Sequence, residues 1–269
     1  DAAGVVVNST SEQLQAVDEV ICMGYDLGMN TPGGFSEYIR VPAEWVLAKP
    51  EPLSLYEAMQ IGTAGFTAAQ CVDRLLVLGV QADQGPVLVT GATGGVGSLA
   101  VALLAHLDFE VAAVTGKEQE HNFLQQLGCT TILSRKKAIG RAGAAMLRER
   151  WAGVVDTVGG DILASAIKAT RYNGIITSCG NAASGELSMT VYPFILRGVS
   201  LVGIDSACCP MHRRKEIWQQ LAGPWRAGMA KALNSMTHSI PLDQLSSVID
   251  NMLAGQTKGR IVVNTGGSI

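Results

Sequence analysis

The chain has 269 residues, 48% of them hydrophobic and 16% charged, which allows a sizeable core in one large domain or two ordinary ones. Its net charge of -3 at pH 7 gives no overall basic field, so we expect no nucleic-acid partner. The longest apolar run, "SLAVALLAHL", has the length of a core helix, and we expect no membrane association. The six cysteines show no C-x-x-C spacing, which indicates reduced thiols in a cytoplasmic protein.

The first part of the chain predicts a β-rich region followed by a helix. Residues 1–50 are rich in Gly, Pro and β-forming side chains, which favours short antiparallel strands and turns. Residues 54–78 have a helical pattern that two glycines interrupt. Because glycine costs helix stability, close packing or ligand approach should compensate for it. Thr63 and Thr67 are therefore candidate ligand contacts, and a tight helix–sheet contact explains the pattern equally well.

The middle of the chain, residues 86–204, alternates short β-rich runs with amphipathic segments. Most of these runs show little polar alternation, as expected for strands buried on both faces. Strand–helix alternation predicts an α/β fold with a parallel, doubly wound sheet. The expected strands are Pro86–Gly91, Glu110–Gly116, Thr130–Leu133, Gly153–Gly159, Gly174–Gly180 and Ser200–Ile204, and the expected helical segments are Gly95–His106, Glu118–Leu127, Ala142–Arg150, Asp161–Ala169 and Val191–Leu196.

The last part of the chain predicts helices over 213–221 and 242–254 and a closing strand over 260–263. The first of these helices begins with the basic stretch "MHRRKEIW". A solvated helix face explains this charge better than phosphate recognition does.

The stretch "TGATGGVG" follows a predicted strand and opens a predicted helix. Its glycines, at 91, 94, 95 and 97, permit a tight turn and let the backbone touch a ligand. The free N–H groups of the helix start suit a pyrophosphate. An ordinary strand–helix turn is the alternative, but the βαβ context favours dinucleotide binding.

The end of the second expected strand bears on the choice of cofactor. An NAD site usually has Asp or Glu at this point, whereas here the chain reads Thr115-Gly116-Lys117. A hydroxyl, a flexible glycine and a cation suit a 2′-phosphate, which favours NADP(H) over NAD(H). A helix-start turn with a solvated lysine is the alternative. The stretch Ser134–Lys137, "SRKK", could add positive charge there, although a solvated turn is the better interpretation.

Other kinds of chemistry find little support. The four histidines lack metal-ligand spacing, "GATGG" lacks the lysine of a P-loop, and no G-x-S-x-G elbow occurs. Cys179, at a strand end, could be a nucleophile, but a small residue beside a flat ring is the better interpretation. Asp156 ends the preceding strand and is equally compatible with a structural or a functional role.

Several stretches follow one another in a familiar order: "GGFSEYIRVPAEWVLAKP", "IGTAGFTAA", "VLVTGATGGVGSLAVALL", "DTVGGDILA", "PFILRGVSLVGIDS" and "KGRIVV". In this order they resemble the medium-chain dehydrogenase/reductase superfamily, and within it the YhdH/YhfP-type branch of acrylyl-CoA reductases and quinone oxidoreductases. The resemblance implies a Rossmann domain over 76–205. It also implies a discontinuous, GroES-like catalytic domain over 1–75 and 206–269. Because "DAAG" matches an interior stretch of the family, we expect part of that catalytic domain to precede Asp1, which would leave it incomplete here.

The resemblance also implies NADPH as the cofactor and no zinc. The motif positions assign the pyrophosphate to the glycine turn, the 2′-phosphate to the "TGK" stretch, and the nicotinamide ribose or ring to the "CGN" stretch. Lys117 stands where Arg is common in the family. A tyrosine near the nicotinamide belongs to the part expected before Asp1, so no catalytic residue is assigned. The predicted cofactor-binding residues are Thr63, Thr93, Gly94, Gly95, Val96, Gly97, Ser98, Thr115, Gly116, Lys117, Cys179, Gly180 and Asn181.

The function implied is reduction of an activated C=C bond by hydride transfer to the β-carbon of an enoyl thioester or ketone, with acrylyl-CoA favoured. Reduction of a quinone by the same hydride is the alternative within the family. A non-catalytic NADPH-binding protein is the alternative from another class. Relatives pair through the edge strand of the sheet, so we expect a homodimer through Ser200–Ile204 and the adjoining Val191–Gly198.

Overall fold

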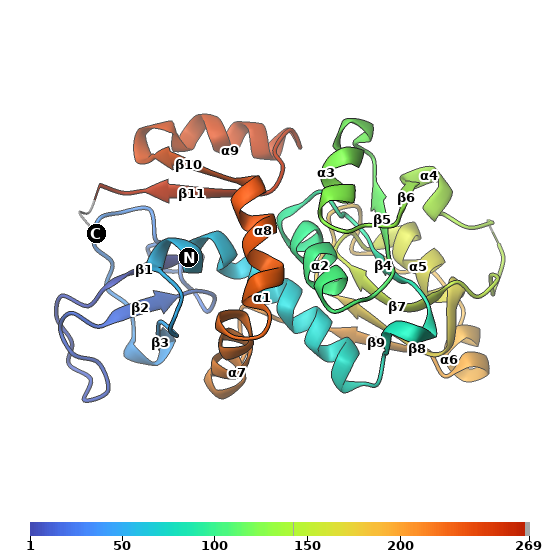
Figure 1. The fold of residues 1–269 in the computed structure, drawn as a ribbon, viewed down its shortest axis with the longest axis horizontal. Coiled ribbons are helices and arrows are strands. Elements are labelled where there is room, and N and C mark those ends of the chain that lie inside the picture. Colours follow the sequence, from blue (N-terminus) through green and yellow to red (C-terminus); the bar gives the residue numbers. More distant parts are fainter. Residues whose placement is uncertain (142, 267–269) are drawn as a thin grey trace. The chain divides into compact units, whose positions relative to one another are not determined.

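The computed structural model describes residues 1–141 and 143–266, and the chain forms two compact units. The first unit comprises Asp1–Phe66, Asp205–Arg226 and Leu233–Ile269. The second comprises Thr67–Ile204 and Ala227–Ala232. Figure 1 shows the helices and strands of both units with their labels.

The second unit is built on a six-stranded parallel sheet in the order β6-β5-β4-β7-β8-β9. This confirms the predicted parallel, doubly wound architecture. Within this sheet the first strand in the sequence is β4. The next two strands, β5 and β6, lie on one side of it, and β7, β8 and β9 lie on the other, so the topological switch point lies at β4. The strands are β4 (Val87–Val89), β5 (Val111–Thr115), β6 (Thr131–Ser134), β7 (Trp151–Asp156), β8 (Thr170–Ser178) and β9 (Ser200–Gly203).

Helices cover this sheet, and the core between them is apolar. Every residue of β4, β5 and β7 is buried, which explains why these strands show no polar alternation in the sequence. Side chains of α5, such as Ile162 and Ile167, pack with strand residues such as Val154 and Ile176 in one cluster. The helices of this unit that lie between strands are α2 (Gly95–His106), α3 (His121–Gln126), α4 (Arg135–Ala138), α5 (Gly160–Ala169) and α6 (Tyr192–Arg197).

The expectation of a helix over 142–150 is wrong for residues 143–150, which form turns and irregular structure; Ala142 lies outside the described residues. The reason is that this segment uses its N–H groups elsewhere. Leu147 donates to the carbonyl of Lys168 at 3.0 Å, and Arg150 donates to that of Ala169 at 2.8 Å. These partners, at the end of α5, replace the hydrogen bonds of a helix.

The first unit contains a three-stranded antiparallel sheet, as the composition of residues 1–50 predicts, and a separate two-stranded parallel sheet. Of the two glycines in α1, only Gly62 breaks the helix, with φ 48° and ψ -160°. The sequence did not indicate α8 or β10. The elements are β1 (Ala2–Val5), β2 (Glu19–Cys22), β3 (Val46–Ala48), α1 (Leu55–Val77), α7 (Met211–Ala222), α8 (Arg226–Met236), β10 (Thr237–Pro241), α9 (Leu245–Leu253) and β11 (Arg260–Asn264), of which α1 and α8 also contribute residues to the second unit.

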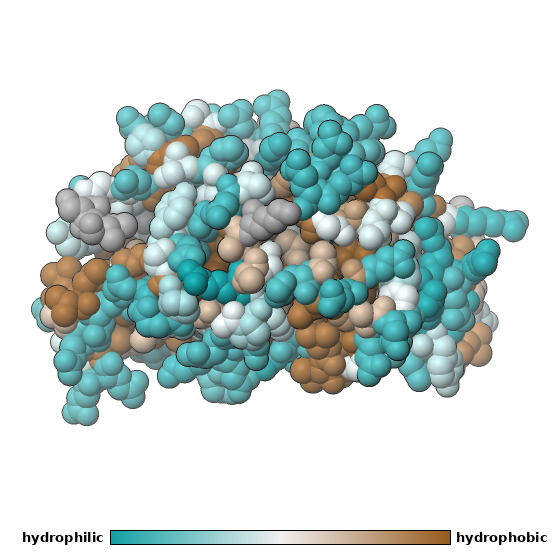
Figure 2. Space-filling view, viewed as in Figure 1, coloured by the Kyte–Doolittle hydropathy of each residue, from teal (hydrophilic) through white to brown (hydrophobic). Residues whose placement is uncertain are grey.

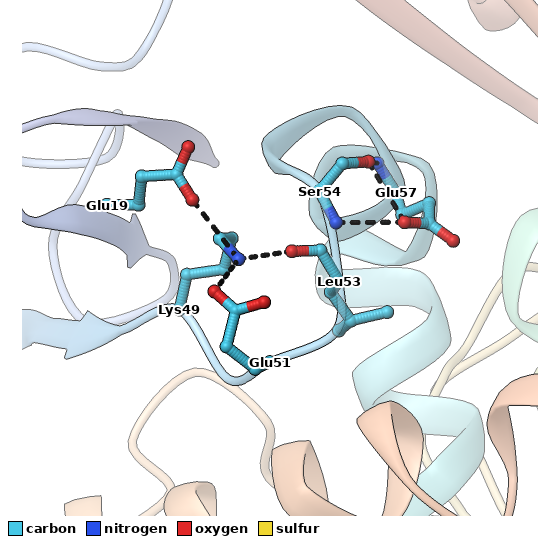
Figure 3. A network of polar contacts seen from close by, with 6 residues as sticks. All are labelled: Glu19, Lys49, Glu51, Leu53, Ser54 and Glu57. Atoms are coloured by element: carbon cyan, nitrogen blue, oxygen red, sulfur yellow. Dashed lines mark hydrogen bonds and ion pairs between the residues drawn. The ribbon is translucent and has the colours of Figure 1, made fainter.

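A buried lysine ties the antiparallel sheet to the start of α1 (Figure 3). Lys49 is 8% exposed, and its ammonium lies 3.2 Å from Glu19 and 2.9 Å from Glu51. Burial alone would lower the pKa of Lys49, but its hydrogen bonds and attraction to Glu51 and Glu19 raise it. Next to it, Ser54 and Glu57 form a reciprocal cap, because Ser54 donates its N–H to the Glu57 carboxylate and accepts the Glu57 N–H.

The surface is mixed in polarity. Figure 2 shows a largely polar face on which several separate hydrophobic patches appear. Within the described residues, no helix has both the length and the hydropathy that a membrane span requires.

Candidate cofactor site

The turn between β4 and α2 contains glycines because neighbouring backbone atoms leave no space for a Cβ there. A Cβ on Gly97 would lie 2.4 Å from the carbonyl oxygen of Gly91 and 2.8 Å from the Cα of Ala92. Gly91 has φ 58°, and a Cβ there would lie 2.3 Å from Oγ1 of Thr157. Glycine at 91 and 97 therefore lets the start of α2 lie directly on the preceding turn.

The amino end of α2 has no side-chain cap. Gly94 is its exposed N-cap residue, and Ser98 directs its hydroxyl to the Gly94 carbonyl oxygen at 2.7 Å. The first N–H groups of a helix have no partner within the helix, and they carry the positive end of its dipole. An uncapped helix start behind a bare turn is therefore suited to bind a pyrophosphate.

A buried carboxylate joins the ends of three strands beside this turn. Asp156, at the end of β7, is fully buried. It accepts the hydroxyl of Thr90 at 2.7 Å and the N–H of Gly159 at 3.0 Å, and the Ser178 hydroxyl lies 3.4 Å away. Thr90 and Ser178 belong to the ends of β4 and β8, so Asp156 fixes these three strand ends relative to one another.

The environment of Asp156 indicates a structural role. Burial raises its pKa, although the hydrogen bonds from Thr90 and from the Gly159 N–H oppose this shift. Its carboxylate oxygens are occupied by these donors. Of the two roles that the sequence left open, the structure supports the structural one.

At the end of β5, two hydroxyls and a cation lie close together. Thr115 is buried, and its hydroxyl lies 3.4 Å from that of Thr93, which follows β4. The Thr115 hydroxyl also accepts the N–H of Lys117 at 3.0 Å. Gly116, between them, is exposed. No acidic side chain occupies the tip of this strand, as the sequence indicated.

Cys179 lies directly after β8 and is half-buried. Its N–H donates to the Asp156 carbonyl at 2.9 Å. A hydrogen bond with Cys71 of α1 lowers the pKa of Cys179, while burial and Asp156 oppose that change. No pattern in the sequence indicated Cys71, because it lies in a helix far from Cys179 in the chain. A Cβ on the next residue, Gly180, would lie 2.6 Å from the Thr157 carbonyl oxygen.

All the predicted cofactor-binding residues except Thr63 lie in or directly after the ends of β4, β5 and β8, or in the first turn of α2. They share the carboxyl edge of one parallel sheet, where ligands of such folds bind. Thr63 belongs to the first unit. There its N–H and hydroxyl both donate to the carboxylate of Asp1, at 2.8 and 2.6 Å.

Within residues 1–141 and 143–266, no group of three or more His, Cys, Asp or Glu side chains is arranged to hold a metal ion. Asn181, exposed after β8, completes the "CGN" stretch. The groups available at the edge are therefore N–H donors, hydroxyls, a half-buried thiol and cations, a set suited to a phosphorylated ligand.

Comparison with known proteins gives concordant results. The family described as "Zinc-binding dehydrogenase" matches residues 95–222. YhfP of Bacillus subtilis, named as a quinone oxidoreductase, is 41% identical over 98% of this chain and 79% of its own length. AcuI of Ruegeria pomeroyi, an acrylyl-CoA reductase, is also 41% identical, over 98% of this chain and 79% of its own length.

Solved structures show the same architecture. The structure of Escherichia coli K-12 YhdH with bound NADPH superposes with a TM-score of 0.93 at 38% identity, over 98% of this chain and 80% of that one. The structure of Bacillus subtilis YhfP with NAD bound also gives a TM-score of 0.93, at 40% identity over 97% of this chain and 79% of that one.

Proposed function

Because this chain belongs to the medium-chain dehydrogenase/reductase superfamily, in the branch of YhfP and the AcuI acrylyl-CoA reductases, we propose that it reduces the activated C=C bond of an enoyl thioester. The protein is an NADPH-dependent oxidoreductase. Acrylyl-CoA is the substrate that we favour, because two relatives, AcuI of Ruegeria pomeroyi at 41% identity and AcuI of Escherichia coli at 39%, carry that substrate in their names.

Two features of the structure support the cofactor part of this proposal most directly. The uncapped amino end of α2 lies at the same sheet edge as the end of β5, where Thr115, Gly116 and Lys117 stand without a carboxylate. The first feature suits a pyrophosphate and the second suits a 2′-phosphate rather than free ribose hydroxyls. The residues of this edge therefore fit NADPH.

The chain's own residues have three tasks in this reaction. NADPH, when bound, supplies the hydride. The first turn of α2 holds the pyrophosphate, and Thr115 to Lys117 hold the adenosine end. Cys179, whose N–H donates to the Asp156 carbonyl, borders the nicotinamide together with Gly180 and Asn181, and these residues determine which groups approach it. We assign the catalytic domain to residues 1–75 and 206–269 and the cofactor domain to 76–205.

Charge develops on the carbonyl oxygen of an enoyl thioester when its β-carbon gains a hydride. Donors that face this oxygen must stabilise the enolate, and the α-carbon then takes up a proton. No residue of this chain is assigned as that proton donor.

Turnover assays test the proposal. The purified protein should oxidise NADPH with acryloyl-CoA and produce propionyl-CoA in equal amount. A quinone and a blank without acceptor are run beside it, because YhfP is named for quinone reduction. Oxidation with the quinone alone would favour the second candidate, and NADPH binding without any turnover would favour a non-catalytic role. Activity should also survive exhaustive chelation of zinc.

We further infer a homodimer through Ser200–Ile204 and Val191–Gly198. Among residues 1–141 and 143–266, β9 is the last strand of its sheet and pairs only with β8, so one of its two edges has no partner strand. On the adjoining segment, Val191 is 62% exposed and Ile195 is 68% exposed. Extension of the sheet across a two-fold axis would cover both features.

Sedimentation at micromolar concentration tests this assembly. The parent protein should sediment as a dimer, and Ile195→Asp should shift it toward the monomer. Leu253→Asp changes a side chain that is 82% exposed, in α9 of the first unit, and should leave the dimer intact. A monomeric parent would contradict the inference.

A further inference from the structure

Two thiols of the second unit that are far apart in the chain lie against each other. Cys71, in the part of α1 that belongs to this unit, is hydrogen-bonded to Cys179, which directly follows β8. The side chain of Cys71 also contacts the hydroxyl of Thr177. Because residues two apart along a strand face the same side of the sheet, Thr177 and Cys179 both direct their side chains toward α1.

The packing of α1 on the sheet holds this pair of thiols in place. Leu75, one helical turn after Cys71, is fully buried, and its Cδ2 would lie 3.4 Å from a Cβ on Gly153 of β7. Residues four apart lie on one face of a helix, so Cys71 and Leu75 both face the sheet. Cys179 donates its N–H to the Asp156 carbonyl at 2.9 Å, and its sulfur lies 3.4 Å from the same oxygen.

The two thiols differ in exposure and in acidity. Cys71 is fully buried, whereas Cys179 is half-buried. Their mutual hydrogen bond lowers the pKa of Cys179, although burial opposes this change, and the same hydrogen bond together with burial raises the pKa of Cys71. The thiolate is the form that attacks an oxidant. Cys179 is therefore the thiol that reacts first, and Cys71 is a second thiol already in contact with it.

We propose that Cys71 and Cys179 form a reversible intramolecular disulfide when hydrogen peroxide reaches the cofactor site, and that this disulfide and the bound cofactor exclude each other, an inference that rests on the proposed function. The Cys179 thiolate attacks one peroxide oxygen, the O–O bond breaks, and Cys179 becomes a sulfenic acid. The hydroxide that leaves takes up a proton to form water.

The second step closes the disulfide. The Cys71 thiol attacks the sulfenic sulfur of Cys179, the S–O bond breaks, and water leaves with the thiol proton. The two thiols lose two electrons in total, and these electrons reduce one hydrogen peroxide to two waters. A dithiol reverses the oxidation by exchange at the disulfide.

The cofactor and the disulfide compete for the same thiol. A nicotinamide that borders Cys179 would cover the sulfur that peroxide must reach, so bound cofactor should slow the oxidation. Closing the disulfide brings the two sulfurs to about 2.05 Å, which turns the Cys179 side chain toward α1. This changes the surface that borders the nicotinamide, so the oxidised protein should bind the cofactor less tightly.

Peptide mapping after oxidation tests the disulfide itself. The full chain, reduced and then treated with hydrogen peroxide, should yield a cross-link between the peptides of Cys71 and Cys179, which a dithiol removes. In Cys71→Ser, the cross-link should be absent and Cys179 should gain oxygen atoms, because no thiol resolves its sulfenic acid. Cys129→Ser is the matched control and should keep the cross-link, since Cys129 is a buried thiol of the same unit whose partners are the carbonyls of Val111 and Thr131.

Cofactor binding tests the mutual exclusion. Saturating NADP⁺ should slow formation of the cross-link at least about fivefold, whereas 2′,5′-ADP, which lacks the nicotinamide, should not. NADP⁺ carries no hydride, so its protection cannot come from reduction of the peroxide. The oxidised parent should bind NADP⁺ at least about fivefold more weakly than the reduced parent, and a dithiol should restore the affinity.

The outcomes separate this proposal from the proposed function. A reduced parent that binds no NADP⁺ would contradict the cofactor assignment and, with it, the mutual exclusion. A parent that binds NADP⁺ but yields no cross-link between Cys71 and Cys179 would overturn only this proposal. A cross-link that forms equally fast with and without NADP⁺, or that leaves the affinity for NADP⁺ unchanged, would also overturn it. Cys71→Ala, which buries no hydroxyl, is the second variant and should behave like Cys71→Ser.

Discussion

At the ends of β4 and β7 the polar side chains of Thr90 and Asp156 are buried and bonded to each other, whereas directly after β5 and β6 Gly116 and the cations of α4 are exposed. Asp156 has no exposed surface, and its oxygens are occupied by donors of the protein. Gly116 and Arg135 are exposed. Both regions lie at the carboxyl edge of one sheet. Buried hydrogen bonds hold the backbone at one end of this edge, and charged side chains are exposed at the other end.

This difference assigns separate tasks to the two regions. A change in the buried region should alter stability first, because it leaves donors unpaired or forces backbone atoms apart. A change in the exposed region should alter the choice of cofactor with little effect on stability, since exposed charges contribute little to folding.

The largest effect is expected for Gly97→Ala. Its Cβ would meet backbone atoms of Gly91 and Ala92 that have no room to move. We expect a loss of about 3 kcal/mol in the free energy of unfolding, measured in urea, together with loss of NADPH binding. Gly116→Ala, which meets only a flexible side chain, should cost less than about 0.5 kcal/mol. Equal costs at the two positions would remove the distinction between the regions.

Asp156→Asn should have the next largest effect. The amide offers one acceptor oxygen to donors that now share two, so we expect a loss of about 2 kcal/mol in stability. The pKa of Asp156 is raised from 3.8, so the folded chain holds this proton more tightly than the unfolded chain does. The stability that Asp156 contributes is therefore full below pH 3.8 and falls as pH rises through its folded pKa.

Unfolding in urea at several pH values measures this dependence. The stability difference between the parent and Asp156→Asn should shrink as pH increases above the ordinary carboxyl range, because the variant lacks the titrating group. A difference that grows with pH would contradict the assignment of burial as the main cause of the shift.

In the exposed region, Lys117→Glu should change selectivity. We expect the parent to bind NADPH at least about tenfold more tightly than NADH, equivalent to 1.4 kcal/mol. Glutamate would repel a 2′-phosphate and accept hydrogen bonds from ribose hydroxyls, so the preference should vanish or invert. Lys215→Glu makes the same change of net charge on an exposed residue of α7 and should leave the preference intact. Equal dissociation constants for the two cofactors in the parent would refute the prediction.

The smallest effect is expected for Ser134→Ala, which removes the cap of α4. The helix is short and exposed, so the cost should be about 0.5 kcal/mol in thermal unfolding. NADPH binding should weaken less than about threefold, because the substitution removes a cap but changes no charge. A loss of about tenfold or more in NADPH affinity would contradict this expectation.

Local pattern in the sequence determined much of the second unit. Buried β-rich runs alternating with amphipathic segments predict a parallel sheet, and the glycine spacing from 91 to 97 predicts the turn before α2. Likewise the chain shows directly that Thr115, Gly116 and Lys117, at the tip of this strand, include no carboxylate. Each of these features depends on residues that are adjacent or a few positions apart.

Only the tertiary structure determined the contacts between residues that are far apart in the chain. Thr90 and Asp156 are 66 positions apart in the chain, and their hydrogen bond follows from the pairing of β4 with β7. Residues 143–150 form no helix, and the end of α5 accepts the N–H groups of Leu147 and Arg150. Arg135 belongs beside Gly116 because the register of β5 and β6 brings them together. Periodicity reports which face of an element is buried, but the strand order and register decide which side chains meet.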